Sequence, residues 1–515
     1  MSLIKNVVTV GGWTLLYRVS SFIRDIAQST ILGAGIFADV FSLSFKLANI
    51  LRKLFAEGAF NASFLPIFAS TLKDKGPKEA QKIASQIFTW LVIMVTCFMI
   101  VFLICFRNIM HVYAAGIEPS SDKFNHLVAI GRISSPYIAT SFLAALFGGI
   151  LNTVNRFAMP AAIQLTLNIF IVIALFIGAL SFPSVAYTMA WATFLSGVIQ
   201  VAVLWLSVGY CNFSIGFNFS RVGDEVKIFF KKLVSGAIGS GVWQLNVIID
   251  FMILSFLPTG AVSYFFYTDH VNQFPLGILG IAFSTALLPP LTKAIHAKNS
   301  VVAQKQMDLG LLFAFMFTFP AAVILMSLNH PMTGAIYGHG KFTIEQVTAA
   351  APALAAFALG LPAYMATKVF STVFFAHKNT KIPLNGGIVS LVTNLLFIVL
   401  LMPYMKHTGI ALATTLSSWC NGIYLVFKLK ELGTMGIDRN VITECLKQLL
   451  ISAIMLASIL AMNIYADSYY TNGGIERNIA LAIVCGISIT VFVIAGKMLN
   501  VFSFLKEIKS MQTHE

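Results

Sequence analysis

Long apolar runs alternate with short polar segments along the whole chain. A helix needs roughly 20 apolar residues to cross a hydrocarbon core of about 30 Å, and fourteen runs of the sequence can form such crossings. The runs are continuous, which favours α-helices over the short alternating segments of a β-barrel. Their approximate bounds are 5–32, 37–70, 87–106, 124–152, 159–180, 185–208, 232–257, 260–292, 307–328, 345–376, 382–403, 407–427, 441–465 and 478–500.

The composition supports a membrane location. Hydrophobic residues make up 58% of the chain and charged residues 10%, with a mean hydropathy of +0.84, whereas soluble domains carry about 25% charged residues. The net charge of +14 comes from basic residues scattered singly through short loops, so topology explains it better than nucleic-acid binding. The sequence therefore predicts an all-α polytopic membrane protein with no nucleic-acid partner.

The loop charges predict the orientation. With loops assigned alternately to the two sides, 22 of the 34 Lys and Arg residues lie on the side of both termini, 5 lie on the other side, and seven are intramembrane. This bias places both termini in the cytoplasm. The first run lacks a cleavage site for a signal peptide and is expected to remain as the first helix.

A faint internal repeat divides the chain. Six positions recur 223 residues later, among them Asn49 as Asn272 and Pro66 as Pro289. Each unit of the repeat holds six crossings, so both copies have the same orientation, as in transporters built from parallel repeats. We predict two six-helix lobes in parallel pseudo-symmetry, residues 1–220 and 221–437, followed by two additional transmembrane helices in residues 438–515.

Charged residues are concentrated in the first two crossings. An intramembrane charge costs at least about 2.5–3.5 kcal/mol, so such residues face protein or water. In one interpretation each arginine pairs with a carboxylate and pins helices together. In the other, the surplus cations bind an anionic substrate, for which arginine offers bidentate hydrogen bonds. The charged residues are Arg18, Arg24, Asp25, Asp39, Lys46, Arg52, Lys53 and Glu57.

The eighth crossing is the counterpart of the second in the repeat. It carries Asp269, His270, Asn272 and Gln273 at membrane depth. His270 is interpreted either as a hydrogen-bonded core residue or as a titratable cation.

Motifs of enzymes are absent from the sequence. There is no Walker loop, HExxH or GxSxG motif, so the chain has no recognisable nucleotide engine and is predicted not to be an enzyme. The six cysteines form no CxxC pair and are interpreted as buried thiols without a disulfide or metal role. No cofactor or metal is expected.

Several motifs identify a family resemblance. The run RVSSFIRD…LGAG…ADVF…FKLANILRKLFAEGAFNASFLP, together with LNTVNRFAMP, QFPLGILGIAFSTALLP and YGHGKFT, closely resembles the MurJ (MviN) family of lipid II flippases. The resemblance extends from the N-terminus to at least residue 430. It implies the fold of the multidrug/oligosaccharidyl-lipid/polysaccharide exporter superfamily, with two extra helices that form a groove for a polyprenyl tail.

The resemblance also implies roles for individual residues. Arg18, Arg24 and Arg52 are expected near the diphosphate of the substrate, and Asp39 and Glu57 match family acids. The family usually has Arg where this chain has His270. We expect the substrate to contact Arg18, Arg24, Asp39, Arg52, Glu57, Asp269, His270 and Gln273.

The expected function is translocation of undecaprenyl-diphosphate-linked disaccharide-peptide (lipid II) from the cytoplasmic to the outer leaflet of the bacterial inner membrane. Alternating access around a cationic cavity is the expected mechanism, driven by a monovalent cation gradient, the membrane potential or consumption of the product. Three alternatives remain. They are an ion-coupled exporter of drugs or of another lipid-linked oligosaccharide, a membrane scaffold, and an integral-membrane transferase.

Overall fold

The structure is a computed structural model of the chain. It describes residues 3–181, 184–221, 223–286, 288–431, 436, 438–472 and 474–504, and some side chains within helices, including that of Glu57, lie outside the description. The described residues form twenty α-helices and one π-helix, with no β-strand among them. The predicted all-α class is confirmed.

The helices divide between two compact units, and the first comprises residues 1–263. Its elements are α1 (Leu3–Leu32), α2 (Ile36–Leu51), the π-helix η1 (Arg52–Ala59), α3 (Phe60–Asp74), α4 (Gly76–Ile104), α5 (Phe106–Tyr113), α6 (Asp122–Ser134), α7 (Tyr137–Thr153), α8 (Ala158–Ala162), α9 (Leu165–Ser181), α10 (Val185–Gly209) and α11 (Asp224–Leu254).

The second unit comprises residues 264–515 and begins within α12. Its elements are α12 (Ala261–Ala286), α13 (Leu288–His296), α14 (Ser300–Ser327), α15 (Asn329–Tyr337), α16 (Ile344–Ala358), α17 (Leu361–Ala376), α18 (Lys381–Glu431), α19 (Arg439–Asn472) and α20 (Gly474–Met498). The predicted lobe boundary at residue 220 and the separate C-terminal pair stay predictions.

The predicted crossings agree with the observed helices. Among the described residues, nine helical segments are long and apolar enough to span a membrane, which makes this a multi-pass membrane protein. One of them is α18, in which Lys406 has φ 48° and separates two helices, as the predicted crossings 382–403 and 407–427 require. Four further crossings coincide with α1, α2 to α3, α11, and α12 to α13. The structure is consistent with fourteen crossings.

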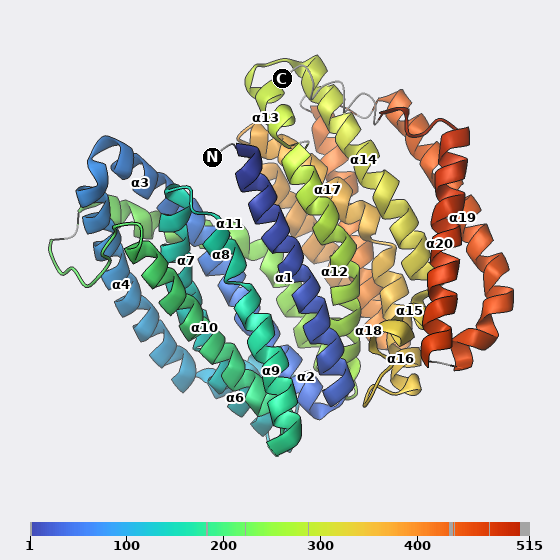
Figure 1. Cartoon of the computed structure of the whole chain (residues 1–515), viewed down its shortest axis with the longest axis horizontal. Helices are drawn as coiled ribbons and strands as arrows, with labels where there is room; N and C mark the ends of the chain where they lie inside the picture. Colours follow the sequence, from blue (N-terminus) through green and yellow to red (C-terminus); the bar gives the residue numbers. More distant parts are fainter. Residues whose placement is uncertain are drawn as a thin grey trace. The chain divides into compact units, whose positions relative to one another are not determined.

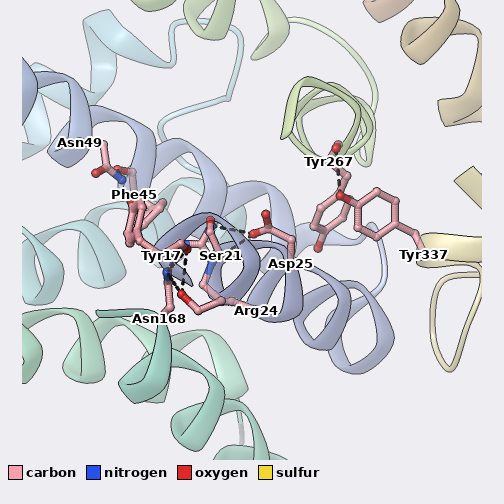
Figure 2. Close-up of polar contacts among 10 residues, drawn as sticks. Tyr17, Ser21, Arg24, Asp25, Phe45, Asn49, Asn168, Tyr267 and Tyr337 are labelled. Atoms are coloured by element: carbon pink, nitrogen blue, oxygen red, sulfur yellow. Dashed lines mark hydrogen bonds and ion pairs between the residues drawn. The ribbon is translucent and has the colours of Figure 1, made fainter. Parts of the chain in front are cut away.

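The same local structures occur at matching points of both units. The Tyr113 hydroxyl donates to the Leu43 carbonyl, and 224 residues later the Tyr337 hydroxyl donates to the Tyr267 carbonyl at 3.1 Å (Figure 2). A left-handed residue follows α7 at Asn155 (φ 61°), and another follows α17 at Lys378 (φ 59°). These paired features, 224 and 223 residues apart, agree with the repeat that the sequence predicts at a spacing of 223.

Three details differ from the sequence interpretation. The segments 107–123 and 329–344 were expected to be loops, but they contain most of α5 and the whole of α15, which are too short for the length criterion of a crossing. The connection expected between the crossings 185–208 and 232–257 is shorter than predicted, because α11 already begins at Asp224. The cysteines are not buried: Cys97 is exposed and the other five are half-buried, since many apolar faces of this fold point outward.

Each unit is packed by large apolar side chains. In the first unit, the rings of Phe60, Phe64 and Phe68 of α3 follow one another in contact, and Phe229 of α11 meets the first two edge to face. Close packing of this kind holds helices together in lipid, where burial from water no longer favours association. Helix α9 lies between α1 and α10 (Figure 1), and this arrangement positions the polar residues of α1.

The second unit has its own core. Residues of α14, α17 and α18 form one apolar cluster, which includes Met307, Val369 and Leu425. Helices α19 and α20 pack on each other and α19 packs on α14 (Figure 1), so the last two helices belong to this compact unit.

Candidate functional site

Arg24 is fully enclosed in a polar network inside the first unit. Its side chain is 3% exposed, and Nε and Nη2 donate to Asp25 Oδ1 at 3.1 and 2.7 Å. Nη1 donates to Asn168 Oδ1 of α9 at 3.0 Å, and Nη2 donates to Ser21 Oγ at 3.2 Å (Figure 2). The Phe45 ring lies 5.1 Å from the guanidinium carbon. The network neutralises the charge of Arg24 and ties α1 to α9.

Asn168 completes this network from the other side. Its Nδ2 donates to Ser20 Oγ at 2.8 Å and to the Tyr17 carbonyl at 3.3 Å. The amide therefore uses its oxygen for Arg24 and its nitrogen for α1, which fixes the rotation of α1 about its axis. Arg18 lies on the same helix and is half-buried.

Arg52 is placed differently, at the junction where α2 becomes a π-helix. Residues Arg52–Ala59 form η1, and π-helical turns within helices occur frequently at functional sites. Arg52 is half-buried, and its Nε donates to Asn49 Oδ1 at 3.2 Å. Glu57 belongs to the same π-helix, but its side chain lies outside the described residues.

Arg52 lines a cavity that lies wholly within the first unit. The cavity has a volume of about 440 Å³, within the range of pockets for small ligands. Arg52 is the one charged residue among the described lining residues. The polar lining consists of Thr14, Asn61, Tyr137, Ser141, Asn152, Gln164 and Gln200, and small residues of α7 leave the space open.

Asp39 is fully buried and has several hydrogen-bond partners. It forms an ion pair with Lys123 Nζ at 2.9 Å. It also accepts hydrogen bonds from the Gly260 amide at 2.9 Å, the Ser263 amide at 3.0 Å and Ser263 Oγ at 2.7 Å. These contacts cap the first turn of α12, because free N–H groups at a helix start favour an acidic partner. In this structure Asp39 is a structural anchor.

The predicted residues of α12 lie in the second unit. Asp269 and His270 are half-buried, and Gln273 is exposed. Gln273 Nε2 donates to Asp269 Oδ1 at 3.3 Å, and the His270 ring lies 4.2 Å from the ring of Phe266. The spacing of four residues places Asp269 and Gln273 on one face of α12.

The sequence interpretation missed several functional partners. Asn168 and Lys123 contact Arg24 and Asp39 from 144 and 84 residues away, and no spacing rule relates such positions. The polar lining residues of α7 and α10 also escaped notice. An amide inside an apolar run, as at Gln200, is the signal that could have identified them.

The chain matches a known family over most of its length. Residues 28–481 match the family model described as "Lipid II flippase MurJ". A protein from Rhizobium meliloti (strain 1021), named "Probable lipid II flippase MurJ", is 33% identical over 464 residues, 89% of this chain and 86% of that protein. A "Lipid II flippase MurJ" from Burkholderia cenocepacia is 31% identical over 439 residues, 84% and 85% of the two chains.

Solved structures show the same fold. The structure described as "Lipid II flippase MurJ, inward closed conformation" aligns with a TM-score of 0.81 at 24% identity, covering 97% of this chain and 99% of that one. An inward-facing multidrug resistance MATE transporter of the MOP superfamily aligns with a TM-score of 0.67 at 13% identity, covering 83% and 98%. On the family match and the curated relatives, the chain belongs to the MurJ family of lipid II flippases.

Proposed function

We propose that this protein translocates lipid II, the undecaprenyl-diphosphate-linked disaccharide-peptide, from the cytoplasmic to the outer leaflet of the bacterial inner membrane. The observation that carries the proposal is the family match over residues 28–481, supported by relatives at 33% and 31% identity that bear the flippase name. The localisation, with both termini in the cytoplasm, rests on the loop charges.

The arginines supply the chemistry that a diphosphate needs. A guanidinium stays charged when it is removed from water and can donate two hydrogen bonds to one phosphate. Arg52 lines a cavity and Arg18 is half-buried, so we assign the headgroup contact to these two. Arg24 is enclosed with Asp25, and we assign it the role of holding α1 in place in this conformation.

We also propose roles for the remaining predicted residues. Asp269, His270 and Gln273 of α12 present half-buried or exposed polar groups, which suits a second surface for the headgroup. His270 would replace the family's arginine as a cation when it is protonated. For Glu57 we propose a contact with the headgroup on the family resemblance alone. For Asp39 we propose an indirect contribution, through the start of α12.

Transport would proceed by alternating access. A monovalent cation gradient, the membrane potential or consumption of lipid II outside the cell would supply its free energy. Moving one charge through 100 mV is worth about 2.3 kcal/mol. A second candidate is ion-coupled export of drugs or of another lipid-linked oligosaccharide, which the likeness to a MATE transporter favours. The cationic surplus in the first two crossings speaks against a cationic drug as the substrate.

Depletion in living cells tests the proposal. Cells that depend on this chain are depleted of it, and the fraction of lipid II accessible to a membrane-impermeant label at the outer face is measured. We expect the accessible fraction to fall while total lipid II rises. An unchanged leaflet distribution after depletion would contradict the proposed function. Re-expression of the wild-type chain should restore the distribution.

A further inference from the structure

The cavity in the first unit has more polar lining than binding of a diphosphate requires. Arg52 is the one cation among its described lining residues, whereas four amide side chains and three hydroxyl side chains share the space. We infer that this cavity is a subsite for the saccharide of the substrate, an N-acylated, hydroxyl-rich sugar next to the diphosphate. The inference rests on the proposed function and deepens it.

Unused hydrogen-bonding groups support this assignment. Within the described chain, the half-buried side chain of Asn152 and the exposed side chain of Gln164 form no hydrogen bond, and both line the cavity. Gln200 is 5% exposed and donates through Nε2 to Thr166 at 3.1 Å, while its carbonyl oxygen accepts no bond from the described residues. Each amide can donate and accept, as the hydroxyl and N-acyl groups of a sugar require.

The same groups argue against a lipid tail as the occupant. An acyl or prenyl chain offers no hydrogen bond, so it would leave the amide of Asn152 and the carbonyl oxygen of Gln200 unsatisfied in an apolar environment, at a cost of about 1–3 kcal/mol for each group. The apolar part of the lining also suits a sugar. Phe157 and Pro160 offer flat faces for the CH groups of a sugar ring, and Ala144, Ala145 and Gly148 make room for it.

The position of the cavity along the helices fits loading from the side of the termini. Its lining residues on these helices lie in the first half of α1, along α7 from Tyr137 to Asn152, and in the last half of α10. Helices α7 and α10 end on the side where α1 begins in the predicted topology, which is the cytoplasmic side. A headgroup that arrives from the cytoplasmic leaflet would therefore meet this cavity, with its diphosphate beside Arg52.

A comparison of two ligands tests the inference. The purified full-length protein is titrated with lipid II and with undecaprenyl diphosphate, which lacks the sugars and the peptide. The double variant Asn152→Ala/Gln164→Ala should bind lipid II about tenfold more weakly, since two hydrogen bonds are lost, and should bind undecaprenyl diphosphate with unchanged affinity. Asn108→Ala, an exposed amide on α5, should change neither affinity.

Two substitutions of different size at Gly148 test whether the subsite needs its volume. A Cβ at Gly148 would meet only Pro160, at 3.6 Å, which is an ordinary contact. Gly148→Ala should therefore retain lipid II binding, whereas Gly148→Leu should weaken lipid II binding and spare undecaprenyl diphosphate. Thermal melting confirms that both variants fold.

The outcomes separate this inference from the proposed function. Unchanged lipid II affinity in the double variant, or an equal loss for both ligands, would overturn the saccharide subsite while transport of lipid II by the wild type still stands. Absence of lipid II transport by the wild-type protein would defeat the proposed function itself. Selective loss of lipid II affinity in both tests supports the subsite.

Discussion

At the scale of single residues, two arginines of similar sequence context occupy different environments. Arg24 is buried and hydrogen-bonded to Asp25 and Asn168, whereas Arg52 is half-buried and lines a cavity. The sequence offered two interpretations of the intramembrane arginines, helix pairing and anion binding. In this structure the first describes Arg24, and the second is our proposal for Arg52.

Substitution of the two arginines should separate these roles. Arg24→Ala removes the guanidinium that forms an ion pair with the buried Asp25, so we expect a loss of about 3–5 kcal/mol in stability. We also expect loss of complementation, that is, the variant should not support growth of cells depleted of the wild-type chain. Arg52→Ala should abolish complementation with little change in the melting temperature. Growth assays and thermal melting of the purified variants check this. A normally growing Arg52→Ala strain would refute the role assigned to Arg52.

The buried pair Asp39–Lys123 should be more important for stability than any exposed pair. Asp39→Asn removes the charge opposite a Lys123 side chain that is 16% exposed, and we expect a loss of about 3–5 kcal/mol. The double variant Asp39→Asn/Lys123→Met should recover part of that loss, because it no longer leaves an unpaired ammonium. A double-mutant cycle by thermal melting measures the coupling, and strictly additive effects would argue against it.

The exposed pair Lys75–Glu225 should contribute less to stability than the buried pair does. The sign of the pH dependence of its contribution follows from the two pKa shifts. The hydrogen bond from Lys75 lowers the pKa of Glu225, and the same bond raises the pKa of Lys75. The carboxylate therefore stabilises the fold above its ordinary pKa of 4.5 and loses this contribution as the pH falls through its lowered pKa. Glu225→Gln should lower the melting temperature only slightly at pH 7, and high salt should erase the difference.

His270 stands where the family resemblance leads us to expect an arginine. If protonated His270 acts as a cation, His270→Arg should retain complementation and should flatten the dependence of transport on pH between roughly 5 and 8. Transport assays at several pH values compare the variant with the wild type. An inactive His270→Arg protein would refute the idea that histidine substitutes for a fixed positive charge.

At the scale of elements, hydrophobic periodicity predicted the long helices but not the short ones. The crossings around α18 were correct because Lys406 interrupts two apolar runs. Helices α5 and α15 have 8 and 9 residues, too few to produce the signal of a crossing. The π-helix η1 was also missed, since nothing in its composition distinguishes a π-turn from an α-turn.

Close approaches between elements should be sensitive to a single methyl group. A Cβ at Gly116 would lie closer than 3.0 Å to backbone atoms of Ser255 and Phe256, and backbone cannot rotate away as a side chain can. Gly116→Ala should therefore destabilise the first unit. Gly12 on α1 has no atom near its Cβ position, so Gly12→Ala should be neutral or stabilising by up to about 1 kcal/mol. Thermal melting compares the two, and equal stability would contradict the contact.

At the scale of the whole molecule, the predicted all-α fold and family are confirmed, and membership in a family of flippases agrees with the prediction that the chain is a transporter and not an enzyme. The repeat was visible because six residues recur at a constant spacing. The site could be predicted only in part. Arginines stand out in apolar runs, whereas partners such as Asn168 come from distant helices and are brought close only by folding.

The central claim is that this chain moves lipid II across a bilayer, and reconstituted transport tests it most directly. The purified protein is inserted into vesicles that contain fluorescently labelled lipid II, and the fraction protected from a membrane-impermeant quencher is followed with time. We expect the wild type to exchange lipid II between leaflets and Arg52→Ala to be inactive. Equal exchange in vesicles with and without the protein, under an imposed ion gradient and membrane potential, would contradict the account.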